Sequence, residues 1–280
     1  MNNNNNKNNV LPILKWAGGK RQLLPILRTH YPREYNTYFE PFLGAGAVLL
    51  DLQPEHAIVN DINEELINVY NNVQNNAENL INVLETYEND KDLFYSIRGL
   101  DRLPIYQFLD PVLRASRILF LNKTCFNGLY RVNKSGHFNV PFGNYKNPNI
   151  INEEGILSLH NYFENNEVIL LNTDFKVALD TASKGDFVYL DPPYDPVNKT
   201  SAFTSYSNDG FTKDDQINLY KTFCELHDRG CKLLLSNSAT EFILDLYKDF
   251  KIELVDASRN INSKGEGRGK VKEVLVKNYD

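Results

Sequence analysis

Seven short runs of aliphatic, β-branched and aromatic residues recur along this chain, and helical patterns lie between several of them. The runs are Thr37–Phe39, His56–Asn60, Val168–Asn172, Phe187–Leu190, Lys232–Ser236, Lys251–Val255 and Glu273–Lys277. One of the helices is expected at Lys213–His227, with Thr212 as its N-cap. Strands that alternate with helices predict an α/β fold with a mostly parallel sheet. A polar loop with Gly and Ser joins the last two runs, so we expect an antiparallel hairpin at one edge of the sheet.

The stretch between the second and third runs is too long for one crossover connection. A βαβ crossover needs only a few tens of residues, so about 90 residues are surplus. They include helical patterns at Asn63–Leu84 and Arg114–Leu121 and a loop-rich stretch at Cys125–Pro148. We predict an inserted, mainly helical subdomain at residues 64–151, a main domain at 1–63 and 152–280, and a disordered Asn-rich tail at 1–9.

Basic residues are segregated along the chain, although its net charge is −6. Residues 1–33 and 114–146 each contain six Lys or Arg and no acidic residue, and residues 259–272 contain five against one Glu. Single basic patches occur on many soluble proteins, but three of them predict a surface that faces a polyanion such as nucleic acid.

Composition argues against several other protein classes. The apolar runs are too short to span a bilayer, and the first residues lack the apolar stretch of a signal peptide. The three cysteines, Cys125, Cys224 and Cys231, have neither metal-ligand spacing nor a disulfide framework. We therefore expect a cytoplasmic protein without a membrane segment and without a bound metal.

The segment Asp191-Pro192-Pro193-Tyr194 follows the run Phe187–Leu190. Proline cannot continue a sheet ladder, so the chain must leave the sheet there. The carboxylate and the prolyl carbonyls can accept hydrogen bonds from an exocyclic amine, and Tyr194 offers a stacking face. The segment indicates a site for an amino-bearing heterocycle, although a proline turn after any strand could produce it.

Three further segments indicate a nucleoside-like cofactor. The turn Glu40–Gly46 contains Gly-x-Gly ahead of the apolar run Ala47–Leu50, which lets a ligand approach the backbone. Asp61 directly follows the run His56–Asn60, at a position where an acidic side chain can bind the two hydroxyl groups of a ribose. The alternative is that Asp61 caps a helix. Asp174 and Phe175 suit an adenine amine and ring. With the third glycine of the dinucleotide fingerprint absent, these features favour S-adenosylmethionine.

The motifs then resemble the Dam family of DNA adenine methyltransferases, which includes GATC-modifying enzymes of restriction–modification systems. The resemblance is carried by Leu14–Lys20, Glu40–Gly46, Asn60–Asn63, Phe126–Arg131, Phe138–Gly143 and Asp191–Tyr194. It implies a Rossmann-like, S-adenosylmethionine-dependent methyltransferase fold with an inserted target-recognition subdomain. It also implies methyl transfer to the amino nitrogen of a flipped adenine in double-stranded DNA at GATC.

The resemblance assigns roles to individual residues. The implied catalytic residues are Asp191, Pro192, Pro193 and Tyr194. The implied cofactor-binding residues are Trp16, Ala17, Gly18, Lys20, Phe42, Gly44, Gly46, Asp61, Ile62, Asp174, Phe175 and Asp191, with S-adenosylhomocysteine as the product.

Within the insertion, Phe126 is expected to wedge into the base stack and Asn127 to occupy the vacated pairing position. Leu129 and Arg131 would read base edges, Arg131 a guanine, although a phosphate contact is its commoner alternative. The full set of implied DNA-binding residues is Lys15, Arg114, Arg117, Lys123, Phe126, Asn127, Gly128, Leu129, Arg131, Asn133, Lys134, Asn139, Pro141 and Lys146. Among these, Arg114, Arg117, Lys123, Lys134 and Lys146 are expected to contact phosphates.

The sequence leaves two other functions open. A cytosine-amino methyltransferase can use a similar loop, and a non-catalytic DNA-binding protein could retain the fold of a cofactor domain. The expected partner is double-stranded DNA, and a cognate GATC endonuclease is a candidate genetic partner. We expect a monomer.

Overall fold

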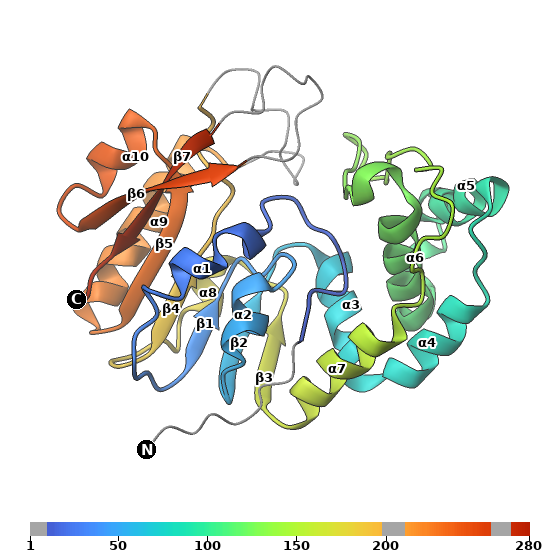
Figure 1. Ribbon diagram of the computed structural model, residues 1–280, viewed down its shortest axis with the longest axis horizontal. Helices are drawn as coiled ribbons and strands as arrows, with labels where there is room; N and C mark the ends of the chain where they lie inside the picture. Colours follow the sequence, from blue (N-terminus) through green and yellow to red (C-terminus); the bar gives the residue numbers. More distant parts are fainter. Residues whose placement is uncertain (1–9, 198–210, 259–269) are drawn as a thin grey trace. The chain divides into compact units, whose positions relative to one another are not determined.

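The computed structural model describes residues 10–197, 211–258 and 270–280 (Figure 1). The tail at 1–9 and most of the third basic stretch lie outside these ranges. The helices are α1 (Leu24–Leu27), α2 (Ala47–Leu52), α3 (Glu64–Asn75), α4 (Ala77–Glu85), α5 (Lys91–Gly99), α6 (Pro111–Thr124), α7 (Glu153–Glu164), α8 (Phe175–Ala178), α9 (Lys213–Asp228) and α10 (Glu241–Leu246). Short 3-10 turns are η1 (Lys20–Gln22), η2 (Leu100–Arg102), η3 (Tyr106–Phe108) and η4 (Phe126–Gly128).

All seven predicted strands are present and form a mixed sheet. The strands are β1 (Tyr38–Glu40), β2 (His56–Asn60), β3 (Glu167–Leu171), β4 (Phe187–Leu190), β5 (Lys232–Ser238), β6 (Lys251–Ser258) and β7 (Lys270–Lys277). Their order in the sheet is β3-β2-β1-β4-β5-β7-β6. β1 pairs in parallel with β2 and β4, and β4 with β5, whereas β7 runs antiparallel to both β5 and β6. The predicted α/β fold with an antiparallel hairpin at its edge is confirmed.

Strand β4 is buried along its whole length. All four of its residues are inaccessible to solvent, and it pairs with a parallel strand on each side. Val188 and Leu190 belong to a core that also includes Leu219 and Phe223 of α9 and residues of β5 and β7. A strand buried on both faces reads as a continuous apolar run, which is why sequence alone located it.

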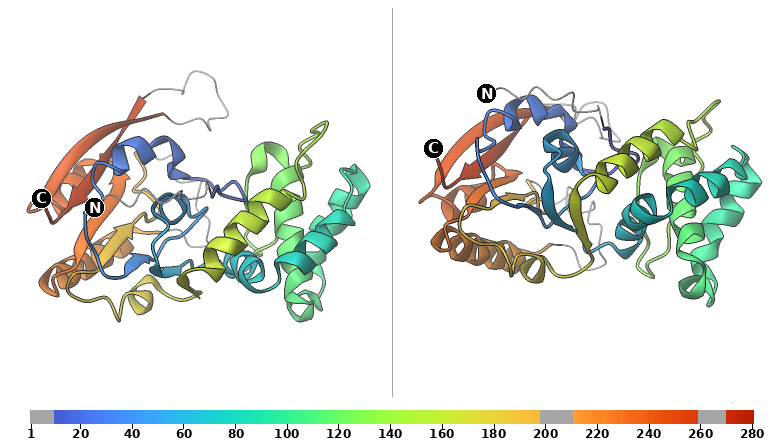
Figure 2. Two further views of the ribbon diagram at one scale, coloured as in Figure 1. Left: turned by 60° about the horizontal axis from the view of Figure 1, so that its bottom comes forward. Right: turned by 90° about the horizontal axis from the view of Figure 1, so that it is seen from below.

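The chain divides into two compact units. Unit 1 comprises residues 1–19, 43–55 and 60–173, and unit 2 comprises residues 20–42, 56–59 and 174–280. In unit 1, α6 packs against α3, α4 and α5, and α7 packs against α3 and α4 (Figures 1 and 2). In unit 2, α9 packs on β5, and β7 pairs with β5 and β6. The inserted subdomain at 64–151 stays a prediction.

Of two helix predictions, the one with its N-cap at Thr212 is confirmed and the one for a single helix at Asn63–Leu84 is wrong. Thr212 caps α9 in a reciprocal capping box, in which its hydroxyl accepts from the Asp215 N–H and the Asp215 side chain accepts from the Thr212 N–H. The single helix expected at Asn63–Leu84 is instead two helices, because Asn76 leaves the helical region with φ −141° and ψ 32°. The apolar period continues through that break, so periodicity alone could not detect it.

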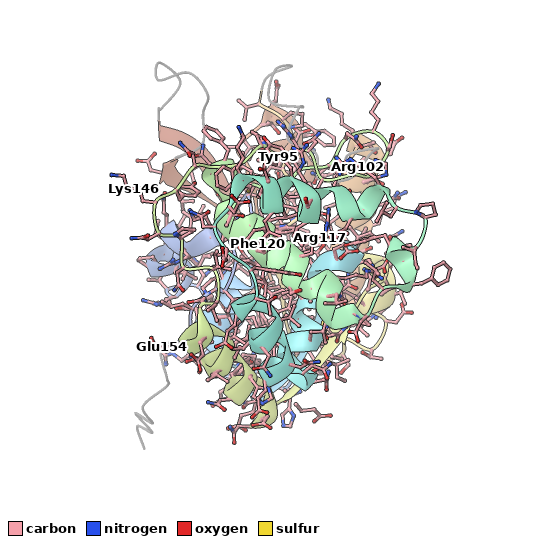
Figure 3. All side chains as sticks on the ribbon, turned by 90° about the vertical axis from the view of Figure 1, so that its right-hand side faces the viewer. Tyr95, Arg102, Arg117, Phe120, Lys146 and Glu154 are labelled. Carbon is pink, nitrogen blue, oxygen red and sulfur yellow. The ribbon has the colours of Figure 1, made fainter. Side chains whose placement is uncertain are left out.

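The phosphate-contact prediction is wrong for Arg114 and Arg117, because both side chains are buried in unit 1. Arg117 is 2% exposed; its Nη2 lies 2.7 Å from Asp101 Oδ2, and its Nε donates to the Ile97 carbonyl. Arg114 is bound by the carboxylates of Glu64 and Glu65. In Figure 3, Arg117 and Phe120 lie among the helices, whereas Lys146 lies at the edge of the view. These arginines hold the helices of unit 1 together.

No helix within the described part of the chain is both long and apolar enough to cross a membrane.

Removing the buried arginine should destabilise the protein. Arg117→Met leaves Asp101 as a buried carboxylate without its buried counter-ion, which should lower the free energy of unfolding by about 3–5 kcal/mol. Urea denaturation would measure the loss. Arg102→Met is the matched control, because Arg102 contacts the same carboxylate from a partly exposed position and should cost about 1 kcal/mol or less. Equal losses in the two variants would contradict this account.

Candidate functional site

The segment Asp191–Tyr194, in unit 2, leaves the sheet at the end of β4, as the prolines require. The Oδ1 atom of Asp191 lies 2.7 Å from Lys20 Nζ and accepts a 2.9 Å hydrogen bond from the Ser236 hydroxyl. Ser236 is on the neighbouring strand β5 and is fully buried. Within the described part of the chain, no hydrogen bond is made to Asp191 Oδ2, so one carboxylate oxygen keeps its full accepting capacity.

The local electrostatics favour a weakly solvated carboxylate at Asp191. Burial raises its pKa, and the Lys20 ammonium and the hydrogen bond from Ser236 oppose this rise. The Asp191 side chain is 18% exposed and that of Lys20 only 7%, so this ion pair is poorly screened by solvent. A charge in such surroundings interacts strongly with any donor that reaches it.

The ring of Tyr194 is fixed from two directions. Its hydroxyl donates a 2.9 Å hydrogen bond to Glu273 Oε2 on β7, and Lys20 Nζ lies 4.6 Å from the ring centroid. Burial, followed by the charges of Asp191 and Glu273, raises the Tyr194 pKa well above its usual range. The side chain therefore remains a neutral phenol that donates to Glu273.

The backbone of the same segment is held by side chains of α9 and β5. The Pro193 carbonyl accepts a 2.9 Å hydrogen bond from Gln216 Nε2, and the N–H of Asp195 donates to Asn237 Oδ1. Gln216 and Asn237 are both buried and hydrogen-bonded to each other. Within the described residues, neither Gln216 nor Asn237 donates to the Pro192 carbonyl. These two side chains therefore fix the loop and leave that carbonyl to accept another hydrogen bond.

Phe42 and Phe175 lie together in unit 2, with ring centroids 5.4 Å apart. A third ring, Phe211, packs edge-on against Phe42 at 5.9 Å. Asp174 caps the short helix α8 by accepting from the Lys176 N–H, and it is exposed. The structure thus brings the predicted residues Phe42 and Phe175 into contact. It adds Phe211, which no sequence motif indicated.

The predicted Gly-x-Gly turn and Asp61 meet in unit 1. Gly44 has φ +51°, and its N–H donates a 3.0 Å hydrogen bond to Asp61 Oδ2. Asp61 Oδ1 accepts from the Asn63 N–H at 2.9 Å. The N-cap of α3 is Asn63, which accepts from the Leu66 N–H, so the alternative in which Asp61 is the cap is wrong. Burial raises the Asp61 pKa, and its two backbone hydrogen bonds oppose the rise.

Trp16 lies at the same place in unit 1. A Cβ added to Gly44 would come within 3.2 Å of Trp16 Cδ1, and the Trp16 ring stacks on Tyr130 with centroids 4.7 Å apart. Ile62, next to Asp61, is 69% exposed despite being apolar. Gly46, by contrast, faces inward, since a Cβ there would meet the Tyr70 hydroxyl at 3.3 Å. Ala17 is half-buried and Gly18 exposed at the end of this segment.

The predicted base-reading segment forms a turn and an irregular hairpin in unit 1. Phe126 is 52% exposed, and its N–H donates to the Pro141 carbonyl. Asn127 adopts the left-handed conformation, with φ 58°. The Arg131 Nε donates a 2.6 Å hydrogen bond to Asn139 Oδ1 across the hairpin. The other predicted DNA contacts that are exposed are Lys15, Asn133, Lys134, Pro141 and Lys146, while Lys123, Leu129 and Asn139 are half-buried and Gly128 is buried.

Two of the remaining predicted DNA-binding residues, Asn133 and Lys123, interact with groups near them. Asn133 Oδ1 accepts from the Ser135 and His137 N–H groups and so shapes the hairpin turn. The pKa of Lys123 is lowered, first by burial and then by the charge of Lys15. Two lysines whose charges repel one another are favourable neighbours for an anion.

Three contacts in these sites involve residues that sequence reasoning missed: Tyr130 on Trp16, Ser236 on Asp191 and Glu273 on Tyr194. Ser236 lay in a predicted strand, one register position beyond the residue paired with Leu190, which was the available signal. Glu273 is 79 positions from Tyr194, and no local pattern predicts such a pairing.

The chain is similar to DNA methyltransferases over nearly its whole length. Residues 16–261 match the family described as D12 class N6 adenine-specific DNA methyltransferase. The chain is 45% identical to the type II methyltransferase M1.LlaDCHI of Lactococcus lactis subsp. cremoris, covering 98% of this chain and 97% of that protein. It is 42% identical to the type II methyltransferase M.MjaIII of Methanocaldococcus jannaschii (96% and 99%) and 36% identical to the DNA adenine methylase of Vibrio cholerae (94% and 94%).

These matches confirm the resemblance drawn from the motifs and set aside the cytosine-amino alternative, since the matched family is adenine-specific. The family implies methyl transfer that depends on S-adenosylmethionine, with DNA as the substrate. The chain belongs to the D12 class of N6 adenine-specific DNA methyltransferases.

Proposed function

We propose that this enzyme methylates the adenine of GATC in double-stranded DNA, with S-adenosylmethionine bound directly by the residues predicted from the sequence. The proposal is carried by Asp191, whose Oδ1 is held by Lys20 and Ser236 while Oδ2 accepts no hydrogen bond from the residues that the structure describes. The recognition segment at residues 126–143, within the proposed inserted subdomain at 64–151, supports the GATC assignment.

The groups in each unit fit the cofactor. In unit 1, both Asp61 oxygens accept one backbone hydrogen bond, and each retains a lone pair for a ribose hydroxyl. The exposed Ile62 offers an apolar surface, and the absence of a side chain at Gly44 lets the Trp16 ring lie close to this turn. In unit 2, Asp174 and the paired rings of Phe42 and Phe175 suit an adenine amine and face.

The target adenine must be flipped out of the duplex, which costs a few kcal/mol. Stacking on Tyr194, worth about 1–3 kcal/mol by analogy with single-strand binding, would offset part of this cost. Because Lys20 lies over the Tyr194 ring, we expect the base on the opposite face. In the recognition segment, Phe126 would fill the gap in the base stack and Asn127 the vacated pairing position.

Asp191 Oδ2 and the Pro192 carbonyl would accept the two amino protons of the adenine, which fixes the nitrogen and directs its lone pair outward. S-adenosylmethionine supplies an electrophilic methyl group. The methylated nitrogen is transiently cationic, and Asp191 Oδ2 is placed to take the proton that it loses. Burial raises the pKa of Cys125 to about 12, so this thiol in the recognition segment is not a nucleophile.

Methyl transfer from labelled S-adenosylmethionine to two duplexes that differ only in GATC versus GTAC tests the proposal. We expect label only in the GATC duplex, recovered as N6-methyladenine after digestion to nucleosides. Equal labelling of both duplexes would contradict the GATC assignment. If the enzyme proves specific, a neighbouring gene for a GATC endonuclease would support a restriction–modification role, as the type II names of two relatives suggest.

Asp191→Ala should abolish transfer, with kcat reduced by at least about 10²-fold, while DNA affinity changes only a few-fold. Single-turnover methylation and a DNA-binding titration measure the two effects. Ser236→Ala is the matched control, because it removes one hydrogen bond to Asp191 but keeps the carboxylate. Near-normal turnover in Asp191→Ala would overturn the mechanism.

The reaction should fail at acidic pH. Only the ionised carboxylate of Asp191 is a strong acceptor for the amino protons and can take up the released proton. Burial raises its pKa, so activity is present above that pKa and lost as pH falls through it. Lys20→Met removes the charge that opposes the rise, so the acidic limb of kcat should move to higher pH. Lys176→Met, at an exposed lysine of unit 2, should leave the limb in place. An unshifted limb in Lys20→Met would contradict this assignment.

Arg131→Ala should relax specificity at a single G·C pair, with a loss there of about 1–3 kcal/mol. With its Nε bound to Asn139, the guanidinium retains both terminal nitrogens for a bidentate contact to guanine. Lys134→Ala is the control, since an exposed lysine on the same hairpin should weaken binding to all sequences alike. Competition binding with singly substituted duplexes distinguishes the two, and a uniform loss for Arg131→Ala would make it a phosphate contact.

A further inference from the structure

A buried asparagine near the end of α6 joins two segments of unit 1. Asn122 is 4% exposed, and its side-chain oxygen accepts a 2.8 Å hydrogen bond from the Lys15 N–H. Its Nδ2 donates to the Lys15 carbonyl at 2.8 Å and to the Gly128 carbonyl at 3.1 Å. One amide thus satisfies both backbone groups of Lys15 and one backbone group of the η4 turn.

The two segments also touch directly. Gly128 has φ +65°, and a Cβ added there would lie 2.6 Å from Lys15 Cδ and 3.2 Å from the Asn122 carbonyl oxygen. Glycine is needed at this position for both the conformation and the close approach. The turn therefore has no space for a side chain beside Lys15, and the hydrogen bonds of Asn122 hold it there.

Each segment leads to a different set of ligand-binding residues. Trp16, directly after Lys15, stacks on Tyr130 and lies beside Gly44, whose N–H binds Asp61. The η4 turn carries the half-exposed Phe126 and the left-handed Asn127. The first set is the proposed cofactor region of unit 1, and the second is the proposed DNA-reading turn.

We propose that Asn122 is a positioning residue that couples cofactor binding to base-pair recognition. A ligand that immobilises Trp16 also immobilises the backbone of Lys15, and the three hydrogen bonds of Asn122 pass that order to the turn at Phe126–Gly128. DNA then binds a turn that is already ordered, so the entropic cost of ordering it is not incurred a second time. Each ligand therefore strengthens the binding of the other. The inference rests on the proposed function of these two regions.

The side chain at this position must be an amide of this length. An aspartate would keep the acceptor for the Lys15 N–H but would repel the Lys15 and Gly128 carbonyls. An alanine would leave those buried carbonyls and the N–H without their partner. Only asparagine supplies one acceptor and two donors at this reach.

The test measures the dissociation constant of a GATC duplex with and without saturating S-adenosylhomocysteine. The wild-type protein should bind the duplex more tightly with this ligand, by about 5–150-fold. In Asn122→Ala that ratio should fall to nearly one, while each ligand alone still binds within a few-fold. The same loss should appear in the reciprocal titration, because coupling between two binding events is symmetric.

Asn72→Ala is the matched control. Asn72 is also a buried asparagine of unit 1, 2% exposed, and its amide donates to the Asn68 and Pro111 carbonyls, but it contacts neither Lys15 nor the turn. It should keep the wild-type ratio even if stability drops. Gly128→Ala provides a second route if Asn122→Ala does not fold, because the added methyl group pushes the turn off Lys15 and should also lower the ratio.

The outcomes are distinguishable. A wild-type ratio retained in Asn122→Ala, or lost equally in Asn72→Ala, overturns the role of Asn122. A wild-type protein that binds both ligands without mutual enhancement overturns it as well. A wild-type protein that binds neither S-adenosylhomocysteine nor the GATC duplex in preference to GTAC contradicts the proposed function itself.

Discussion

The arrangement of unit 2 depends on a carboxylate placed at the end of a fully buried strand. β4 leaves no accessible surface, and the prolines after Asp191 prevent the chain from continuing in the sheet. A carboxylate in that position is expensive to desolvate unless cations and donors surround it. Lys20 and Ser236 meet this demand at one oxygen, and they come from a turn and a strand far apart in sequence. The fold around β4 is therefore organised by solvation as much as by packing.

In unit 1, too, a buried carboxylate is surrounded by cations and hydrogen-bond donors. Asp101 and Arg117 form a buried pair in which the aspartate is also bound by Arg102 and by a backbone N–H. Such a group has little capacity left for a ligand. Asp61 and Asp191, in contrast, keep accepting positions that none of the described residues uses. Incomplete satisfaction, rather than burial or charge alone, separates the candidate site from the structural ion pairs.

Sequence patterns predicted the features that depend on residues close to one another along the chain. The strand positions, the hairpin at the sheet edge and the capping box at Thr212 follow from apolar period and cap chemistry. The two arginines of α6 were misassigned because a count of charges says nothing about burial, and their acidic partners lie elsewhere in the chain. The motif positions were found, but the residues that hold them were not. Asn122 and Glu273 act through long-range contacts that leave no local pattern.

The contact between Tyr194 and Glu273 also bears on how the enzyme is made. Tyr194 precedes its hydrogen-bond partner by 79 residues, and that partner lies on a strand whose neighbours in the sheet are β5 and β6. During translation, the Asp-Pro-Pro-Tyr segment emerges from the ribosome long before β7 exists. The aromatic ring can be fixed only after that strand has been synthesised and inserted between its neighbours. A nascent chain thus acquires its reactive geometry late, after most of the protein has left the ribosome.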